Sequence, residues 1–223
     1  MPNNALSRDP LWADVRQLRP AVQNVAYALR TGNCPPDRFF DCFLPDELRV
    51  VSEQYWTPLV VAKRVADWLD HLGVRTVVDI GSGAGKFCVA AALVGDCSFI
   101  GLEERPLLVA SARRLASAFG LQDRVSFVEG ALGAVPTPNA EAYYLYNPFG
   151  PYWFGPGCRA ETEINCSEAR FARDVATVER ILRRAPVGTY VVTYNGFGGR
   201  MPRSYQQLRI DQQLPATLRL WRK

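Results

Sequence analysis

The chain has 223 residues, of which 48% are hydrophobic and 22% are charged, enough for one large domain or at most two small ones. A formal net charge of +4 does not by itself indicate a nucleic-acid partner. The chain contains no run of eighteen uncharged apolar residues, so we expect no membrane-spanning helix. The first residues lack a basic stretch followed by an apolar one, so we expect no secretory signal.

The first 56 residues are helical and irregular in pattern, and we expect them to form an N-terminal helical extension or cap. Within them, the periodic stretch 11–29 is interrupted by Pro20. A helix then begins at Thr57-Pro58, with Thr57 as the N-cap and Pro58 in the first helical position.

From residue 75 onward, short apolar runs alternate with helical patterns. The expected strands are 75–80, 98–102, 124–128, 142–146 and 188–194, with weaker strands at 207–210 and 217–221. The expected helices between them are 86–94, 106–119 and 166–184. This alternation predicts an α/β fold with a doubly wound, mostly parallel, seven-stranded sheet in a domain that spans residues 57–223.

The loop after the first of these strands, Asp79 to Lys86, holds three glycines in five residues. A P-loop would need glycine at the position of Ile80 and Ser or Thr at that of Phe87, so the loop is not one. A dinucleotide fingerprint would need glycine or alanine at Lys86, because a long side chain there obstructs close helix–strand packing. Both nucleotide interpretations are therefore disfavoured.

The segment Val77 to Gly85 closely resembles the first motif of class I S-adenosylmethionine-dependent methyltransferases, and the resemblance covers residues 57–194. It implies a Rossmann-like methyltransferase fold and the cofactor S-adenosyl-L-methionine. In this family the aspartate at the Asp79 position helps to orient the methionine part of the cofactor, and glycines let the backbone approach it. The loop residues implied to bind the cofactor are Gly81, Ser82, Gly83 and Gly85. A purely structural strand–helix turn is the alternative.

Two further strand ends fit this resemblance. Glu103 lies about twenty residues after the loop, where a carboxylate can accept both ribose hydroxyls. Period-2 alternation and the family pattern favour it over the adjacent Glu104. After the third strand, Glu129-Gly130-Ala131 resembles the segment that brackets the adenine ring, and the backbone of Ala131 or Leu132 competes with the Glu129 side chain for that contact.

The fourth strand ends in Asn147-Pro148-Phe149, which looks like the [Asp/Asn/Ser]-Pro-Pro-[Tyr/Phe] motif of amino-methyltransferases. In that family the Asn side chain and the following carbonyl accept hydrogen bonds from the target amino group, while the aromatic ring stacks on a flat substrate. The resemblance implies catalytic roles for Asn147, Pro148 and Phe149, with Asn147 also beside the cofactor. This chain has one proline where the motif has two, so Phe149 falls one position early. An ordinary turn is the alternative.

The segment before the first helix of the core, Gln54 to Pro58, resembles one whose threonine contacts the cofactor carboxylate in the same enzymes, a role implied for Thr57. A helix N-terminus would favour that anion in any case. Five aromatic residues are expected to shape a substrate pocket: Tyr55, Trp56, Tyr152, Trp153 and Phe154. Packing of the last three on the N-terminal helices is the alternative.

Metal chemistry is not expected, because the six cysteines form no C-x-x-C pair and the one histidine cannot complete a zinc pattern. That histidine, His71, lies at the far end of its helix from the ligand edge, so we expect it to be structural. The cysteines are expected to be reduced thiols in a bacterial cytoplasm.

The implied function is S-adenosylmethionine-dependent methyl transfer to an amino or amide nitrogen of a small molecule, by a monomer or homodimer. A protein acceptor (a lysine or terminal amine), an RNA acceptor and a non-catalytic nucleotide-binding protein of the same fold remain alternatives. Residues 169–223 carry eleven Arg or Lys against three acids, so an RNA would bind this basic C-terminal face. We expect no separate target-recognition domain and hence no sequence-specific DNA methylation.

Overall fold

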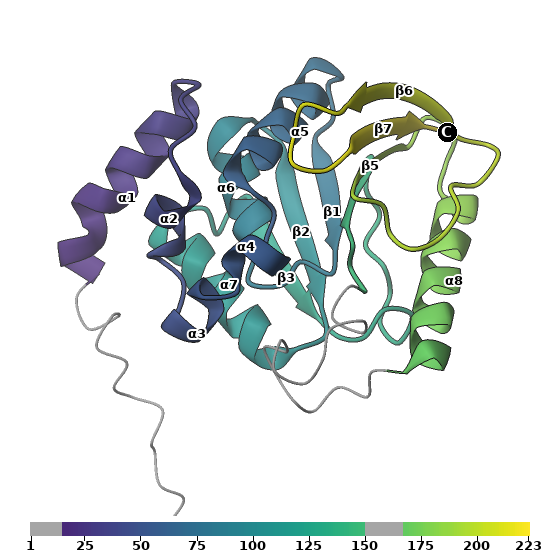
Figure 1. Ribbon diagram of the computed structural model, residues 1–223, viewed down its shortest axis with the longest axis horizontal. Helices are drawn as coiled ribbons and strands as arrows, with labels where there is room; N and C mark the ends of the chain where they lie inside the picture. Colours follow the sequence, from purple (N-terminus) through teal and green to yellow (C-terminus); the bar gives the residue numbers. More distant parts are fainter. Residues whose placement is uncertain (1–14, 150–166) are drawn as a thin grey trace, which may run out of the picture.

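The computed structural model describes residues 15–149 and 167–223, and its central feature is one seven-stranded sheet (Figure 1). The strand order is β3-β2-β1-β4-β5-β7-β6. Strands β1 to β5 are parallel, and β7 is antiparallel to both β5 and β6. The bounds are β1 (Thr76–Ile80), β2 (Ser98–Glu103), β3 (Val125–Glu129), β4 (Ala142–Tyr146), β5 (Tyr190–Tyr194), β6 (Gln206–Asp211) and β7 (Leu218–Arg222). The predicted α/β fold with a mostly parallel sheet is confirmed.

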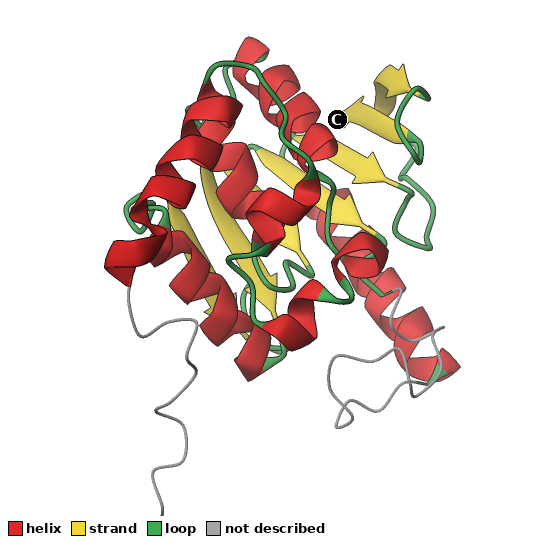
Figure 2. Cartoon of the chain, turned by 60° about the vertical axis from the view of Figure 1, so that its left-hand side comes forward, coloured by secondary structure: helices red, strands yellow, loops and turns green. Residues whose placement is uncertain are grey.

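Helices cover both faces of the sheet, as Figure 2 shows. The described helices are α1 (Val15–Arg30), α2 (Asp37–Asp41), α3 (Asp46–Arg49), α4 (Ser52–Tyr55), α5 (Leu59–His71), α6 (Lys86–Val94), α7 (Pro106–Ala118) and α8 (Glu168–Arg184). Successive strand residues point to opposite faces, so Ala142 and Tyr144 join the core under α5, α6 and α7, whereas Tyr143 and Leu145 join the core under α8. In the described residues no helix is both long enough and apolar enough to cross a membrane.

The N-terminal segment shares the main hydrophobic core instead of forming one of its own. The Phe40 ring of α2 is fully buried and stacks on Phe119, just after α7, with ring centroids 5.2 Å apart. Phe43 meets the same ring edge-on at 5.0 Å. Helix α1 runs through Pro20 without the expected interruption and packs with Val25 and Leu29 buried. The packing is therefore continuous across residue 56, and the domain boundary there stays a prediction.

The start of α5 differs from the predicted N-cap at Thr57. The helix begins at Leu59 with Pro58 in the N-cap position, and neither residue before it caps the helix with a side chain. The Thr57 hydroxyl instead lies 3.0 Å from the Tyr144 hydroxyl, in a buried pair. The Leu59 N–H donates to Asp37 Oδ1 at 2.8 Å. A carboxylate from α2 therefore caps this helix, and the assignment of Thr57 as the N-cap is wrong.

Candidate functional site

The glycine loop joins β1 to α6 at the carboxyl edge of the sheet, where ligands bind in open α/β folds. Gly81 and Gly83 have φ of +79° and +54°, a region that favours glycine. A Cβ at Gly81 would lie 2.8 Å from the Pro148 Cβ, and one at Gly83 would lie 2.4 Å from the Trp56 ring. The close approach that glycine permits thus brings the end of β4 and the segment before α5 against the loop.

Glu103 ends β2 and turns its carboxylate to this loop. Its side chain is almost fully buried, and the Gly83 N–H donates to Oε2 at 2.9 Å. The neighbouring Glu104 faces α8 and pairs with Arg170. Of the two adjacent acids, Glu103 is therefore the one at the glycine loop, as the alternation of the strand predicts.

Asp79 lies on β1 beneath the same loop and is 4% exposed. Among the described residues, its carboxylate receives one hydrogen bond, from the Cys88 thiol at 3.4 Å. Burial is the main cause that raises the pKa of Asp79 to about 7; the Cys88 hydrogen bond lowers this pKa and the nearby Glu103 charge raises it, both by less. A cationic group from a ligand would compensate the buried negative charge and so stabilise the ionised form of Asp79.

The described residues fit a ligand that carries both a cation and a diol. Asp79 offers a carboxylate for an ammonium group, and Glu103 carries the carboxylate oxygens that ribose hydroxyls need, although Gly83 and Arg105 donate to them in this structure. Ser82 Oγ is buried in the loop and has no hydrogen-bond partner in the described part of the chain, so a ligand atom could satisfy it. This combination suits S-adenosylmethionine, whose methionine end carries an ammonium group.

Asn147 follows β4 with φ of +38°, a left-handed conformation that Asn tolerates better than most residues. Its N–H donates to the Gly196 carbonyl at 3.0 Å, and Pro148 lies against Gly81. The Asn147-Pro148 pair therefore adjoins the glycine loop. Phe149 is 6% exposed and meets Phe171 of α8 edge-on at 6.2 Å. Its ring lies in the core beneath α8, which does not support the predicted stacking on a substrate.

The remaining predicted residues are spread around the loop. Trp56 is buried against Gly83 and donates from Nε1 to the Leu48 carbonyl at 3.0 Å, while Tyr55 is half-buried beside it. Glu129 is exposed, and Ala131 is half-buried. The Gly130 N–H donates to the Glu103 carbonyl at 2.9 Å, which holds the predicted adenine segment beside β2. Tyr152, Trp153 and Phe154 lie outside the described residues.

The cofactor carboxylate was expected to lie at Thr57 and the N-terminus of α5. In this structure the Asp37 carboxylate lies at that helix N-terminus. Asp37 caps α5 and also lies 3.2 Å from the Lys86 ammonium. Lys86, the first residue of α6, is 2% exposed and reaches Asp41 at 2.7 Å and Ser52 at 3.1 Å. We call Asp37, Asp41, Ser52 and Lys86 the lysine cluster.

Our interpretation of the sequence did not find the lysine cluster. A signal was present, because a cation at a helix N-terminus is unfavourable unless anions compensate it. The spacing of Asp37 and Asp41, four residues apart, places both on one helix face.

The described part of the chain holds no group of three or more His, Cys, Asp or Glu that could bind a metal ion. His71 is exposed at the end of α5 that leads into the start of β1, and its Nδ1 lies 2.5 Å from the Asp67 carbonyl. It is therefore remote from the glycine loop, as expected.

Comparison with known proteins identifies the fold. An RNA methyltransferase from Salinibacter ruber, solved with S-adenosyl-L-homocysteine, matches 74% of this chain and 92% of its own at 24% identity and a TM-score of 0.53. Mitomycin 7-O-methyltransferase matches 91% of this chain and 60% of its own at 17% identity and a TM-score of 0.54. The chain therefore has the Rossmann-like fold of class I methyltransferases.

One curated relative is similar in sequence over part of its length. A ribosomal protein L11 methyltransferase from Chloroflexus aurantiacus is 35% identical over 77 residues, which are 34% of this chain. The match spans 23% of that relative's length. No family model matches the chain.

Proposed function

We propose that this chain is an S-adenosyl-L-methionine-dependent methyltransferase. The observation that carries the proposal is the meeting of two buried carboxylates, Asp79 and Glu103, at a glycine loop whose Gly83 N–H bonds to Glu103. Asp79 would hold the methionine ammonium group and Glu103 the ribose hydroxyls, with Ser82 and the loop backbone between them. When bound, the cofactor supplies a methyl group activated by its positive sulfur. The similarity in fold to methyltransferases supports this assignment.

We further propose that the acceptor is an amino or amide nitrogen of a small molecule. The Asn147 side-chain oxygen and the Pro148 carbonyl would each accept a hydrogen bond from the acceptor nitrogen, which directs its lone pair toward the methyl group. The position of Pro148 against Gly81 supports this, because the Pro148 carbonyl oxygen would lie 3.4 Å from a Cβ at Gly81, beside the glycine loop. Alignment and exclusion of water would be the main contributions of the chain, since His71 is remote.

Cofactor binding should strengthen as the pH rises through 7. The pKa of Asp79 is about 7 in the native state, against an ordinary value of 3.8. Between pH 3.8 and pH 7, native Asp79 therefore keeps a proton that the unfolded chain has released. Asp79 therefore makes stability fall as the pH rises from about 4 to about 7. A ligand ammonium prefers ionised Asp79, so we expect affinity for S-adenosylhomocysteine to rise about tenfold from pH 6 to pH 8.

Isothermal titration calorimetry at the two pH values measures this change. Asp79→Asn keeps the shape of the side chain and should bind more weakly, with little dependence on pH. A wild-type affinity that does not change with pH would refute the role of Asp79. Absence of binding at millimolar ligand would refute the methyltransferase proposal itself and favour a non-catalytic protein.

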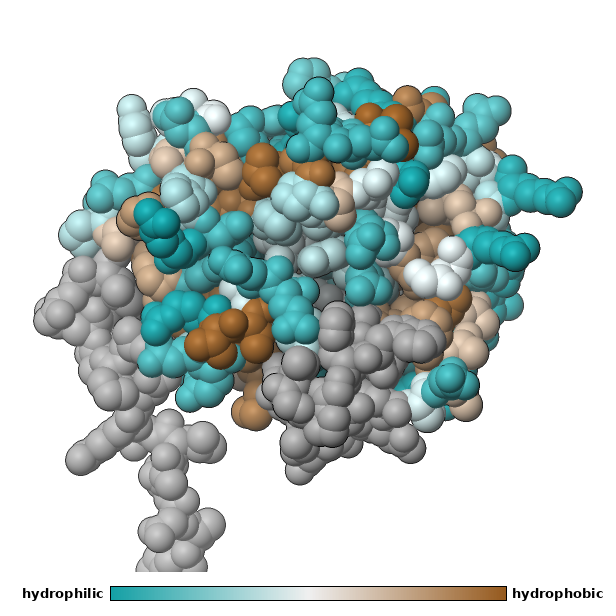
Figure 3. Space-filling view, in the orientation of Figure 1, coloured by the Kyte–Doolittle hydropathy of each residue, from teal (hydrophilic) through white to brown (hydrophobic). Residues whose placement is uncertain are grey.

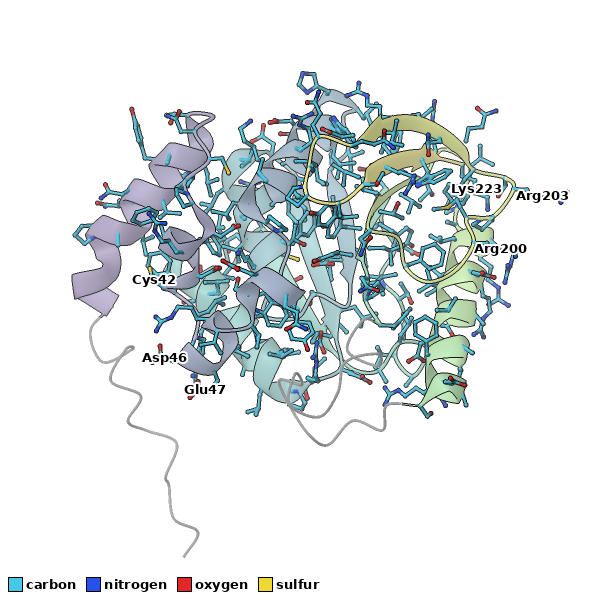
Figure 4. All side chains as sticks on the ribbon, in the orientation of Figure 1. Cys42, Asp46, Glu47, Arg200, Arg203 and Lys223 are labelled. Atoms are coloured by element: carbon cyan, nitrogen blue, oxygen red, sulfur yellow. The ribbon has the colours of Figure 1, made fainter. Side chains whose placement is uncertain are left out.

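A second candidate acceptor is RNA, favoured by an arginine-rich surface around α8. Arg180 and Arg184 are exposed on α8, and Arg200 and Arg203 project from the loop beside it (Figure 4). The Arg200 N–H donates to Glu179 of α8, which ties this loop to the helix. Figure 3 shows polar side chains projecting from the molecule's right-hand edge, where α8 lies in Figure 1. Arginine forks bind phosphates well, so a polyanion complements this surface.

Charge reversal tests the RNA candidate. We expect Arg180→Glu with Arg184→Glu to weaken binding of a fluorescent RNA hairpin and to lower the slope of log affinity against log NaCl concentration by about 2. The matched control is Arg30→Glu with Arg38→Glu, two exposed arginines of α1 and α2, which should leave both quantities unchanged. Equal losses in the two double variants, or no binding at 50 mM NaCl, would leave the small-molecule acceptor as the better proposal.

A further inference from the structure

The carboxylate of Glu103 is fully engaged by the chain's own donors. Oε1 accepts from the Arg105 backbone N–H at 3.0 Å and from Arg105 Nε at 2.8 Å. Oε2 accepts from the Gly83 N–H at 2.9 Å and from Arg105 Nη2 at 3.1 Å. A carboxylate offers about four lone-pair sites. The two hydroxyls of a ribose would therefore meet an acceptor that already has four hydrogen bonds.

Two of these four donors belong to backbone that cannot move without rearranging the site. The Gly83 N–H is part of the glycine loop, and the Arg105 N–H precedes Pro106, whose ring restricts the conformation of the residue before it. The other two belong to the Arg105 guanidinium, on a side chain with several rotatable bonds. This side chain is 15% exposed, so it has a path to solvent. The guanidinium is the group that can yield to a ligand.

We infer that Arg105 competes with the ribose of a nucleoside ligand for Glu103 and so sets the affinity of the site, an inference that rests on the proposed function. The bidentate contact pairs opposite charges at a largely buried position, which makes it a strong competitor. Apparent affinity is reduced by the fraction of molecules in which the guanidinium remains on Glu103. The competition also discriminates among ligands, because only a ligand that satisfies both carboxylate oxygens compensates for loss of the guanidinium.

Removal of the guanidinium should therefore tighten binding. We expect Arg105→Ala, which keeps the backbone N–H contact, to bind S-adenosylhomocysteine about tenfold more tightly than wild type in calorimetry at pH 8. Arg105→Lys replaces the two-pronged contact with a single ammonium group and should fall between the two. The matched control is Arg114→Ala, which removes an exposed arginine from the same region of the chain, on α7, and should change affinity by less than twofold.

A double-mutant cycle shows whether the gain passes through Glu103. Glu103→Gln should weaken binding, and Arg105→Ala should give no further gain in that background. If Arg105 instead orients Glu103 for the ribose, Arg105→Ala will bind more weakly than wild type, which would overturn the inference while the proposed function stands. An unchanged affinity in Arg105→Ala would overturn it equally. Failure of wild type and of every variant to bind would refute the proposed function as well.

Discussion

Replacement of Lys86 by methionine is expected to lower the free energy of unfolding by about 3–5 kcal/mol, the usual cost of removing one partner from a buried ion pair. Lys86 is 2% exposed, and its ammonium lies 2.7 Å from Asp41, which is itself almost fully buried. Methionine fills a similar volume but leaves the carboxylates of Asp41 and Asp37 without the cation that they share. The loss therefore comes from uncompensated charge and not from a cavity.

Urea denaturation followed by circular dichroism measures this loss. The matched control is Lys63→Met, because Lys63 pairs with Asp67 at 2.8 Å on a partly exposed face of α5. That change should cost less than about 0.5 kcal/mol. Asp41→Asn should recover part of the stability in the Lys86→Met background, since it removes a charge that has lost its partner. A Lys86→Met variant within 1 kcal/mol of wild type would show that the lysine cluster does not stabilise the fold.

The lysine cluster also ties the N-terminal segment to the site. Lys86 is the first residue of α6 and follows the glycine loop directly, while Asp37 caps α5 at Leu59. Both helices begin at the edge where the cofactor is proposed to bind. The short helix α2 therefore fixes two helix N-termini at once, and the Lys86→Met variant should also bind S-adenosylhomocysteine more weakly.

Local patterns predicted the sheet well because they depend on neighbours in the chain. Helix α6 and strand β4 have the predicted bounds, 86–94 and 142–146, since turn residues on either side punctuate each of them. The prediction of the α5 cap failed because the capping group is distant in the sequence. Thr57 and Pro58 match the local signature of a helix start, but the side chain that caps the helix belongs to Asp37, twenty-two residues before Leu59. Contacts of that kind depend on tertiary packing and leave no trace in periodicity.

The same distinction applies to the candidate site. Period-2 alternation selected Glu103 over Glu104, because it follows from the geometry of one strand. The bonds between Glu103 and Arg105 were not predicted, because they depend on which rotamer a long side chain adopts. The stacking of Phe149 on a substrate was predicted from a motif alone. Its burial against Phe171 depends on where α8 packs, which the motif does not contain.

Replacement of Asn147 by glycine is expected to lower the rate of methyl transfer on the order of 10³-fold, because the acceptor nitrogen loses one of the two hydrogen bonds that align it. Glycine is the appropriate substitution at φ of +38°. Alanine would add backbone strain and confuse a chemical effect with a structural one. The affinity for S-adenosylhomocysteine should stay within about threefold of wild type, since Asp79 and Glu103 are untouched.

Labelled S-adenosylmethionine and a cell lysate fractionated by size provide the assay, and mass spectrometry of the products separates small-molecule, RNA and protein acceptors. Asn195→Gly is the matched control, because Asn195 is also an Asn in the left-handed region, with φ of +55°, directly after the neighbouring strand β5. It should transfer methyl groups within about fivefold of wild type. Asn147→Asp keeps the acceptor oxygen and should retain more activity than Asn147→Gly. Undiminished transfer by Asn147→Gly would instead mean that the Asn-Pro pair is only the turn that ends β4.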